Sequence, residues 1–180
     1  MKTKPLFVGT VLALTLTSSA WAEHEGNVHD DADGPYHAHE MVFEGFGSAS
    51  FGRETIDNIS ANRIKNDARL GAGIGMSYFF TKHVGVGGDA FVENTAHSFV
   101  DNVSASGIFR LPIGTTGLAP YIYGGGGHEF DLTRQWFAHF GGGLEYRFSS
   151  AIGIFTDARY VLVDKTANYG VVRLGFRTTF

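Results

Sequence analysis

The sequence predicts an all-β fold, an eight-stranded antiparallel up-and-down transmembrane β-barrel. Turn-like segments divide residues 42–180 into eight pieces of strand length, and most pieces alternate apolar and polar residues with period two. The mean hydropathy of the 180-residue chain is −0.03, a value that two opposite faces would average to. No apolar run reaches the roughly 18–20 residues of a membrane-spanning helix. The chain also has no cysteine, which excludes a disulfide scaffold.

Residues 1–22 have the composition of a cleaved signal peptide. Lys2 and Lys4 give a positive start, Leu6 to Leu16 form a short apolar stretch, and Ala20-Trp21-Ala22 suits a signal peptidase. We therefore expect an exported protein. The formal net charge is −4, and loss of the two lysines would make the chain more acidic, so we expect no nucleic-acid partner.

Residues 23–40 form an acidic tail with almost no aliphatic side chain, which cannot bury enough surface to fold alone. Four of the eight histidines lie in it: His24, His29, His37 and His39. His37 and His39 would share one side of an extended chain, and nearby carboxylates could complete a Zn²⁺ or Cu²⁺ site. The alternative is a solvated tail, since the spacing matches no closed metal-site motif. We expect no other cofactor.

Eight strands are expected after the tail, each rich in aromatic residues, β-branched residues and glycine. Their expected bounds are Val42–Phe51, Ala68–Phe80, Val84–Glu93, Asn102–Ile113, Pro120–Glu129, Gln135–Phe148, Ala151–Val163 and Tyr169–Phe180. The odd connections, beginning with residues 52–67, are polar and often longer, whereas the even ones are mostly tight. An up-and-down meander with two kinds of end has this pattern. Pro112 and Pro120 fall at strand ends, as the hydrogen-bond ladder requires.

The even strands justify the prediction of two faces. Their apolar faces are Leu70, Ala72, Ile74, Met76, Tyr78 and Phe80; Val103, Ala105, Phe109, Leu111 and Ile113; Trp136, Ala138, Phe140, Leu144, Tyr146 and Phe148; and Val172, Leu174, Phe176 and Phe180. The opposite faces carry glycine, serine and charged residues. The fifth strand, with Gly124 to Gly127, is ambiguous. A soluble ligand-binding barrel would enclose the apolar face, whereas a membrane barrel would turn it to lipid.

Residue usage favours lipid outside. The polar faces are mostly glycine and serine, which suit a narrow lumen better than a hydrated surface. After the signal peptide only three lysines remain, Lys65, Lys82 and Lys165, all in expected loops or turns, whereas soluble surfaces use lysine freely. Bulky aromatic residues also gather near strand ends, where a membrane interface favours them: Tyr78, Phe79, Phe80, Trp136, Phe137, Tyr146, Phe148, Tyr169 and Phe180.

Arginine and acidic residues on the polar faces predict an ion-pair network in the lumen. The expected members are Glu44, Arg69, Asp89, Arg110, Glu145, Arg147, Asp157, Arg159, Arg173 and Arg177. Glu93 lies on a polar face too. Arginine is the cation that suits enclosed, multiply hydrogen-bonded ion pairs. We expect Glu44, Arg110, Glu145 and Arg173 at the centre of the network, and no open aqueous pore.

Residues Gly141 to Phe148, the Ser-Ser turn after them and Ile152 to Tyr160 resemble the sixth and seventh strands of the small eight-stranded outer-membrane β-barrel family, typified by the membrane domain of outer membrane protein A. The chain's ending is similar to the signal read by the outer-membrane assembly machinery, with Thr178 as a mild departure. The residues that carry this signal are Val172, Leu174, Phe176 and Phe180.

The resemblance covers about residues 41–180 and has several implications. It implies that the chain is a porin-family barrel of the Gram-negative cell envelope with both termini in the periplasm and the odd connections outside the cell. Its implied partners are outer-membrane lipid, lipopolysaccharide and the assembly machinery. The implied state is a monomer.

Three functions are considered for such a barrel. The first is a structural or surface-interaction role with a charge-plugged lumen, and the second is a narrow pore or a small hydrophobic-solute channel. The third is a lipid A-modifying hydrolase, for which His97-Ser98, His128-Glu129 and His139 lie near expected strand ends. Adjacent residues on a strand point to opposite faces, so His97 and Ser98 would not act together. We therefore expect no enzyme.

Overall fold

The computed structural model describes residues 34–52, 54–56, 63–65, 68–93, 100–130, 134–164 and 167–180. Its strands are β1 (Glu40–Phe51), β2 (Glu54–Ile56), β3 (Arg63–Lys65), β4 (Arg69–Phe79), β5 (Val84–Glu93), β6 (Asn102–Arg110), β7 (Leu118–Glu129), β8 (Gln135–Arg147), β9 (Ile152–Val163) and β10 (Tyr169–Thr179). The expected signal peptide, His24, His29, His97, Ser98 and Lys165 lie outside the described residues.

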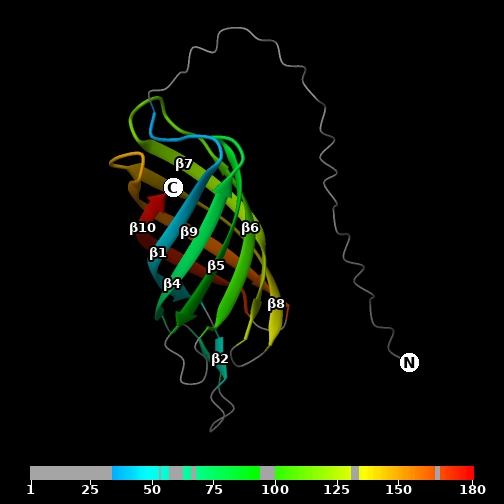
Figure 1. Cartoon of the computed structure of the whole chain (residues 1–180). Helices are drawn as coiled ribbons and strands as arrows, with labels where there is room; N and C mark the ends of the chain where they lie inside the picture. The colour runs from blue at the N-terminus through cyan, green and yellow to red at the C-terminus, as the bar shows by residue number, and fades with distance from the viewer. Residues whose placement is uncertain are drawn as a thin grey trace, which may run out of the picture. The chain divides into compact units, whose positions relative to one another are not determined.

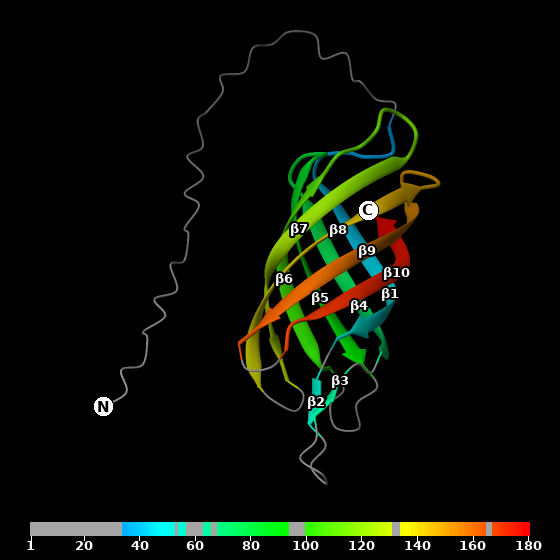
Figure 2. The same cartoon turned by 180° about the vertical axis from the view of Figure 1, so that it is seen from behind.

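Eight of these strands form a closed antiparallel barrel in the order β1-β10-β9-β8-β7-β6-β5-β4 (Figures 1 and 2). The first and last strands close it, with Glu44 opposite Arg177 and Ala49 opposite Val172. On its other side β1 pairs with β4, with Gly45 opposite Ile74. The predicted eight-stranded barrel is confirmed, and β5 has the predicted bounds of Val84–Glu93. The first strand begins earlier than predicted, at Glu40 rather than Val42.

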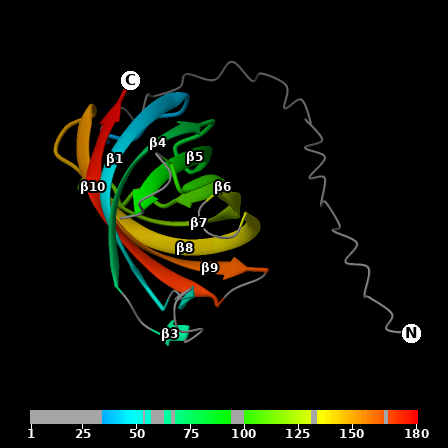
Figure 3. The same ribbon diagram turned by 90° about the horizontal axis from the view of Figure 1, so that it is seen from below.

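The two ends of the barrel differ. We call the end that holds Glu40 and Phe180 the terminal end, and the opposite end the far end. Strands β2 and β3 form a separate two-stranded sheet beyond the far end, nearest the viewer in Figure 3. The sequence predicted a connection without strands there. The pairing of Thr55 with Ile64 corrects this, because β-branched residues favour extended backbone.

The wall of the barrel separates apolar from polar side chains. Large apolar side chains such as Leu70 and Ile74 are 74% and 71% exposed on the outside. Charged side chains such as Arg110 and Glu145 are fully buried inside. This distribution is the reverse of that in a soluble protein, in which charged residues are almost never fully buried unless paired. The apolar face therefore points outward.

The aromatic residues near the strand ends divide between the two faces. Tyr78, Phe80 and Trp136 lie on the outside or at its edge, whereas Phe79 and Phe137 are buried in the lumen. The expectation that all of them gather at a membrane interface was therefore wrong for Phe79, Phe137 and Tyr169. The physical reason is the period of two, which turns neighbouring residues to opposite faces. Among the residues that the structure describes, no helix is long and apolar enough to cross a membrane.

Candidate functional site: the lumen

The terminal half of the lumen holds an ion-pair cluster, which we call the terminal cluster. Its members are Glu40, Glu44, Arg110, Glu145, Arg147 and Arg177. Glu145 lies at its centre: Arg177 Nη1 is 2.6 Å and Arg147 Nε 2.7 Å from its two carboxylate oxygens, and Arg110 Nη1 is 3.8 Å away. Arg177 also reaches Glu44 at 3.1 Å. Period two turns all of these side chains inward from β1, β6, β8 and β10.

Glu40 completes the terminal cluster from the first residue of β1. Its Oε1 lies 2.6 Å from Arg110 Nη2 and 2.7 Å from Arg147 Nη2, and its Oε2 accepts a second bond from Arg147 at 2.9 Å. The sequence placed Glu40 in the acidic tail and missed this role. The signal was available, because Glu40, Val42 and Glu44 follow one another on one face at spacings of two.

The segment before β1 covers the terminal cluster. The Tyr36 ring lies 4.5 Å from the Arg110 guanidinium carbon and 4.3 Å from that of Arg147, and its hydroxyl donates to Gly117 O at 2.7 Å. Arg147 donates to Pro35 O at 2.7 Å. Burial, together with the charge of Glu145, raises the pKa of Tyr36, so the phenol stays protonated as a donor. Cationic groups over an aromatic face are attracted by its quadrupole.

A second cluster, the central cluster, lies deeper in the lumen and consists of Asp89, Asp157, Arg159 and Arg173. Arg173 holds Asp157 through two parallel bonds of 2.8 and 2.7 Å and reaches Asp89 at 3.1 Å. Arg159 pairs with Asp89. This bidentate geometry is the strong form of an ion pair and is particular to the arginine fork.

Aromatic side chains join the two clusters. The hydroxyls of Tyr121 and Tyr123 donate to Asp157 at 2.7 and 3.0 Å. The Tyr121 ring also lies 4.7 Å from the guanidinium carbon of Arg177, which belongs to the terminal cluster. The centre of the Phe155 ring lies 4.3 Å from the guanidinium carbon of Arg177 and 5.8 Å from that of Arg173. The two clusters therefore form one packed unit across the lumen.

Each cluster is electrically neutral by its residue types. The terminal cluster has three arginines and three carboxylates, and the central cluster has two of each. Neutrality matters because an unpaired charge in a dry interior is very costly. Of the ten predicted lumen residues, nine lie in these clusters. Arg69 lies elsewhere, half-buried at the far end of the lumen as the first residue of β4.

The histidines proposed for a hydrolase lie on opposite faces of the wall. His139 is buried in the lumen, where its Nε2 lies 2.8 Å from Ser106 Oγ. His128 is half-buried, and its ring lies 4.9 Å from the ring of outward-facing Trp136. Glu129 is buried and accepts a hydrogen bond from Gln135 at 2.7 Å. The structure therefore does not bring His128 and His139 together.

Two of the four histidines proposed for metal binding are described. His37 is exposed, and His39 Nδ1 lies 3.0 Å from the Tyr78 hydroxyl. Within the described ranges there is no group of three or more His, Cys, Asp or Glu side chains that could hold a metal ion. Because the candidates His24 and His29 lie outside the described residues, the tail site stays a prediction.

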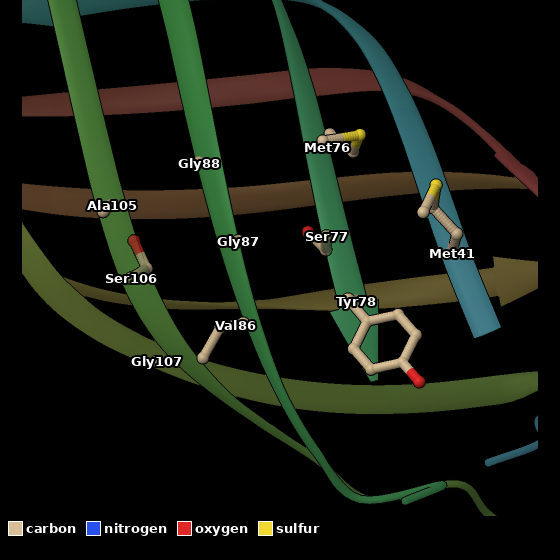
Figure 4. A pocket seen from close by; sticks show the side chains of 10 residues that line it. All are labelled: Met41, Met76, Ser77, Tyr78, Val86, Gly87, Gly88, Ala105, Ser106 and Gly107. Carbon is tan, nitrogen blue, oxygen red and sulfur yellow. The ribbon is translucent and has the colours of Figure 1, made fainter. Parts of the chain in front are cut away.

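A groove of about 600 Å³ lies on the wall formed by β4, β5 and β6 (Figure 4). Its lining includes Met76, Tyr78 and Val86 with Gly88, Ala105 and Gly107. The ladder beneath it is continuous: Met76 pairs with Gly88 and Tyr78 with Val86, while Gly88 pairs with Ala105. The groove is therefore a depression in the outer wall and not an opening into the lumen.

Comparison with known proteins identifies the fold. No protein-family model matches the chain, and no curated protein sequence matches it. Among solved structures, the N-terminal β-barrel domain of Pseudomonas aeruginosa OprF aligns with a TM-score of 0.60 and 18% identity, covering 80% of this chain and 99% of that domain. Ail, the attachment invasion locus protein of Yersinia pestis, in complex with the heparin analogue sucrose octasulfate, aligns with a TM-score of 0.54 and 18% identity, and the alignment covers 79% of this chain and 99% of Ail. The P. aeruginosa outer membrane protein OprG aligns with a TM-score of 0.51 and 13% identity, and the alignment covers 82% of this chain and 98% of OprG. The chain has the fold of small eight-stranded outer-membrane β-barrels.

Proposed function

Starting from this outer-membrane barrel fold, we propose that the chain is an exported outer-membrane protein with a structural or surface-interaction role and a lumen plugged by its own charges. One observation carries the proposal. Five buried arginines meet four buried carboxylates and the half-buried Asp89 in two neutral clusters that fill successive levels of the lumen. Closing eight strands leaves an interior just wide enough for side chains.

A plugged lumen opposes conduction for an energetic reason. A passing ion would have to separate paired groups such as Arg173 and Asp157, which hold each other through two bonds. Leaving one member of a buried pair without its partner costs about 3–5 kcal/mol. The continuous wall beneath the outer groove also opposes a lateral exit for a hydrophobic solute.

The proposed orientation puts the terminal end in the periplasm, as the family resemblance implies, and the even number of barrel strands leaves both chain termini on that side. The far end, with the β2–β3 sheet, then faces outward and supplies the interacting surface. Outer-membrane lipid and lipopolysaccharide surround the apolar wall, the assembly machinery reads the C-terminal strand, and the barrel is a monomer. Residues 1–22 are removed on export, and the acidic segment that begins at residue 23 lies in the periplasm.

The protein is proposed to have no catalytic activity. This is supported by the separation of His128, on the outer side of the wall, from His139, which is enclosed in the lumen. A lipid substrate outside the wall could not reach the contact between His139 and Ser106. Lipid A mass analysis with and without the gene tests this, and a change in acylation that depends on the gene would contradict it.

Conductance in a planar lipid bilayer tests the plugged lumen. The refolded protein should show no resolved openings, whereas well-defined openings would refute the proposal. The conductance of the wild type is compared with that of the double variant Asp89→Ala with Arg159→Ala, which lacks one ion pair of the central cluster. Cell fractionation and heat-modifiable migration on a gel test the location, and recovery from the soluble periplasm without detergent would overturn it.

A further inference from the structure

The outer groove lies where small outward-facing residues interrupt an apolar wall of otherwise bulky side chains. Outward-facing residues form rows across the strands: Met76 of β4 is level with Gly88 and Ala105, and Tyr78 is level with Val86 and Gly107. Figure 4 shows Met76 and Tyr78 along one side of the depression, with glycine and alanine along β5 and β6. A Cβ placed on Gly107 would meet no atom within 4 Å, so the space above it is open.

The groove runs from the level of Tyr78 toward the middle of the wall. Tyr78 lies near the end of β4, and its ring packs edge-on against Phe80 at 5.3 Å. Tyrosine and other aromatic side chains at a strand end mark the membrane interface. Met76 and Gly88 lie one row deeper than Tyr78 and Val86. The groove thus follows the direction of an acyl chain that descends from a headgroup at the interface.

Polar and cationic groups lie at the interfacial mouth of the groove. The Tyr78 hydroxyl lies 3.0 Å from His39 Nδ1. The turn between β4 and β5 carries the exposed Lys82, followed by His83, whose ring stacks on Phe109 of β6. Lys82 lies in the turn after the last residue of β4, four residues beyond Tyr78 and therefore on the headgroup side of it.

We infer that this groove binds one phospholipid with an anionic headgroup from the leaflet at the terminal end. One acyl chain lies over Gly107, Gly88 and Ala105, and the phosphate lies near Lys82. The volume of about 600 Å³ is that of a small-molecule site. The inference rests on the proposed membrane location.

A second copy of the chain fits the groove less well. A two-fold axis along the membrane normal would bring the same face of each copy together, including the Lys82 of both copies at one level. Like charges at an interface disfavour that pairing. An anionic phosphate, by contrast, complements the lysine.

Native mass spectrometry of the refolded full-length mature chain, titrated with phosphatidylglycerol or phosphatidylcholine, tests the inference. We expect one retained phosphatidylglycerol, bound more tightly than phosphatidylcholine. Gly107→Leu fills the groove and should weaken retention at least about tenfold. Gly45→Leu is the matched control, because Gly45 is an exposed β1 glycine with equally open space, and it should bind as the wild type does. Lys82→Gln should weaken phosphatidylglycerol binding about fivefold and leave phosphatidylcholine unchanged.

Equal lipid retention by Gly107→Leu, Gly45→Leu and the wild type would overturn the inference. A lipid-free dimer that Gly107→Leu dissociates would overturn it in favour of the second copy. Heat-modifiable migration is measured on every variant, so a variant that does not fold is recognised, and Ala105→Leu then replaces Gly107→Leu. Failure of lipid binding in a chain that still resides in outer membranes contradicts this inference alone, whereas absence from membranes contradicts the proposed function.

Discussion

Glu40 gives a sharp test of the neutral terminal cluster. It is 4% exposed and contacts Arg110 at 2.6 Å and Arg147 at 2.7 Å. Glu40→Gln keeps the shape of the side chain but leaves three arginines with two carboxylates. Because removing one partner of a buried pair costs about 3–5 kcal/mol, we expect the free energy of unfolding to fall by about 3 kcal/mol. That is a large part of the roughly 5–15 kcal/mol that stabilises a typical protein.

The assay is urea unfolding of the barrel in phospholipid vesicles, followed by heat-modifiable migration. With a slope of about 1–3 kcal/mol per molar urea, the unfolding midpoint should fall by about 1 M or more. Asp164→Asn is the matched control, because Asp164 is exposed at the end of β9 and should change stability by less than about 0.5 kcal/mol. The double variant of Glu40→Gln with Arg110→Met restores neutrality and should cost less than the two single changes together.

The reasoning is refuted if Glu40→Gln unfolds within about 0.5 kcal/mol of the wild type. It is also refuted if the double variant is as costly as the sum of its parts. Either result would mean that water or nearby groups compensate the lost carboxylate, and that neutrality does not control the stability of this cluster.

Three further perturbations test other parts of the structure. Tyr36→Ala should speed the labelling of a Ser77→Cys variant by a small water-soluble thiol reagent at least about tenfold. The reason is that Ser77 is buried in the lumen, beneath the segment that Tyr36 anchors. Gly141→Ala should lower the free energy of unfolding by about 1–3 kcal/mol, since its Cβ would lie 2.5 Å from the backbone oxygen of Ala158 and 2.8 Å from the ring and hydroxyl of Tyr123. Phe180→Ala should reduce the amount of barrel in outer membranes while changing urea unfolding in vesicles by less than about 1 kcal/mol, because Phe180 is 75% exposed.

Each of these has a control. Ser149→Cys, in the exposed turn before β9, should label at the same rate with or without Tyr36. Equal acceleration at both cysteines would indicate general loosening and contradict a local seal. Gly107→Ala, with open space above it, should leave stability unchanged, and a cost equal to that of Gly141→Ala would contradict the crowding argument. Normal membrane levels of Phe180→Ala would remove this residue from the assembly signal.

Most of the architecture could be predicted because it depends on local periodicity. The approximate strand bounds and the separation into two faces follow from alternation that is visible along each strand, as in Leu70 and Ile74, and residue usage predicted that the apolar face points outward. Glu40 was missed because its strongly acidic neighbourhood suggested a tail. Tyr36 was missed for a different reason: its partner Gly117 is distant in sequence and comes near only when the barrel closes.

By itself the sequence determined the eight strands of the barrel, which side chains share a face, and that arginines and acids point the same way. Those properties depend on neighbours two residues apart. Only the tertiary structure decided that Arg173 forms a bidentate ion pair with Asp157, that Arg177 bridges Glu44 and Glu145, and that the charges divide into two neutral clusters. The physical reason is closure: pairing β1 with β10 fixes the relative register of strands far apart in the chain, and the alternation of each strand carries no information about that register.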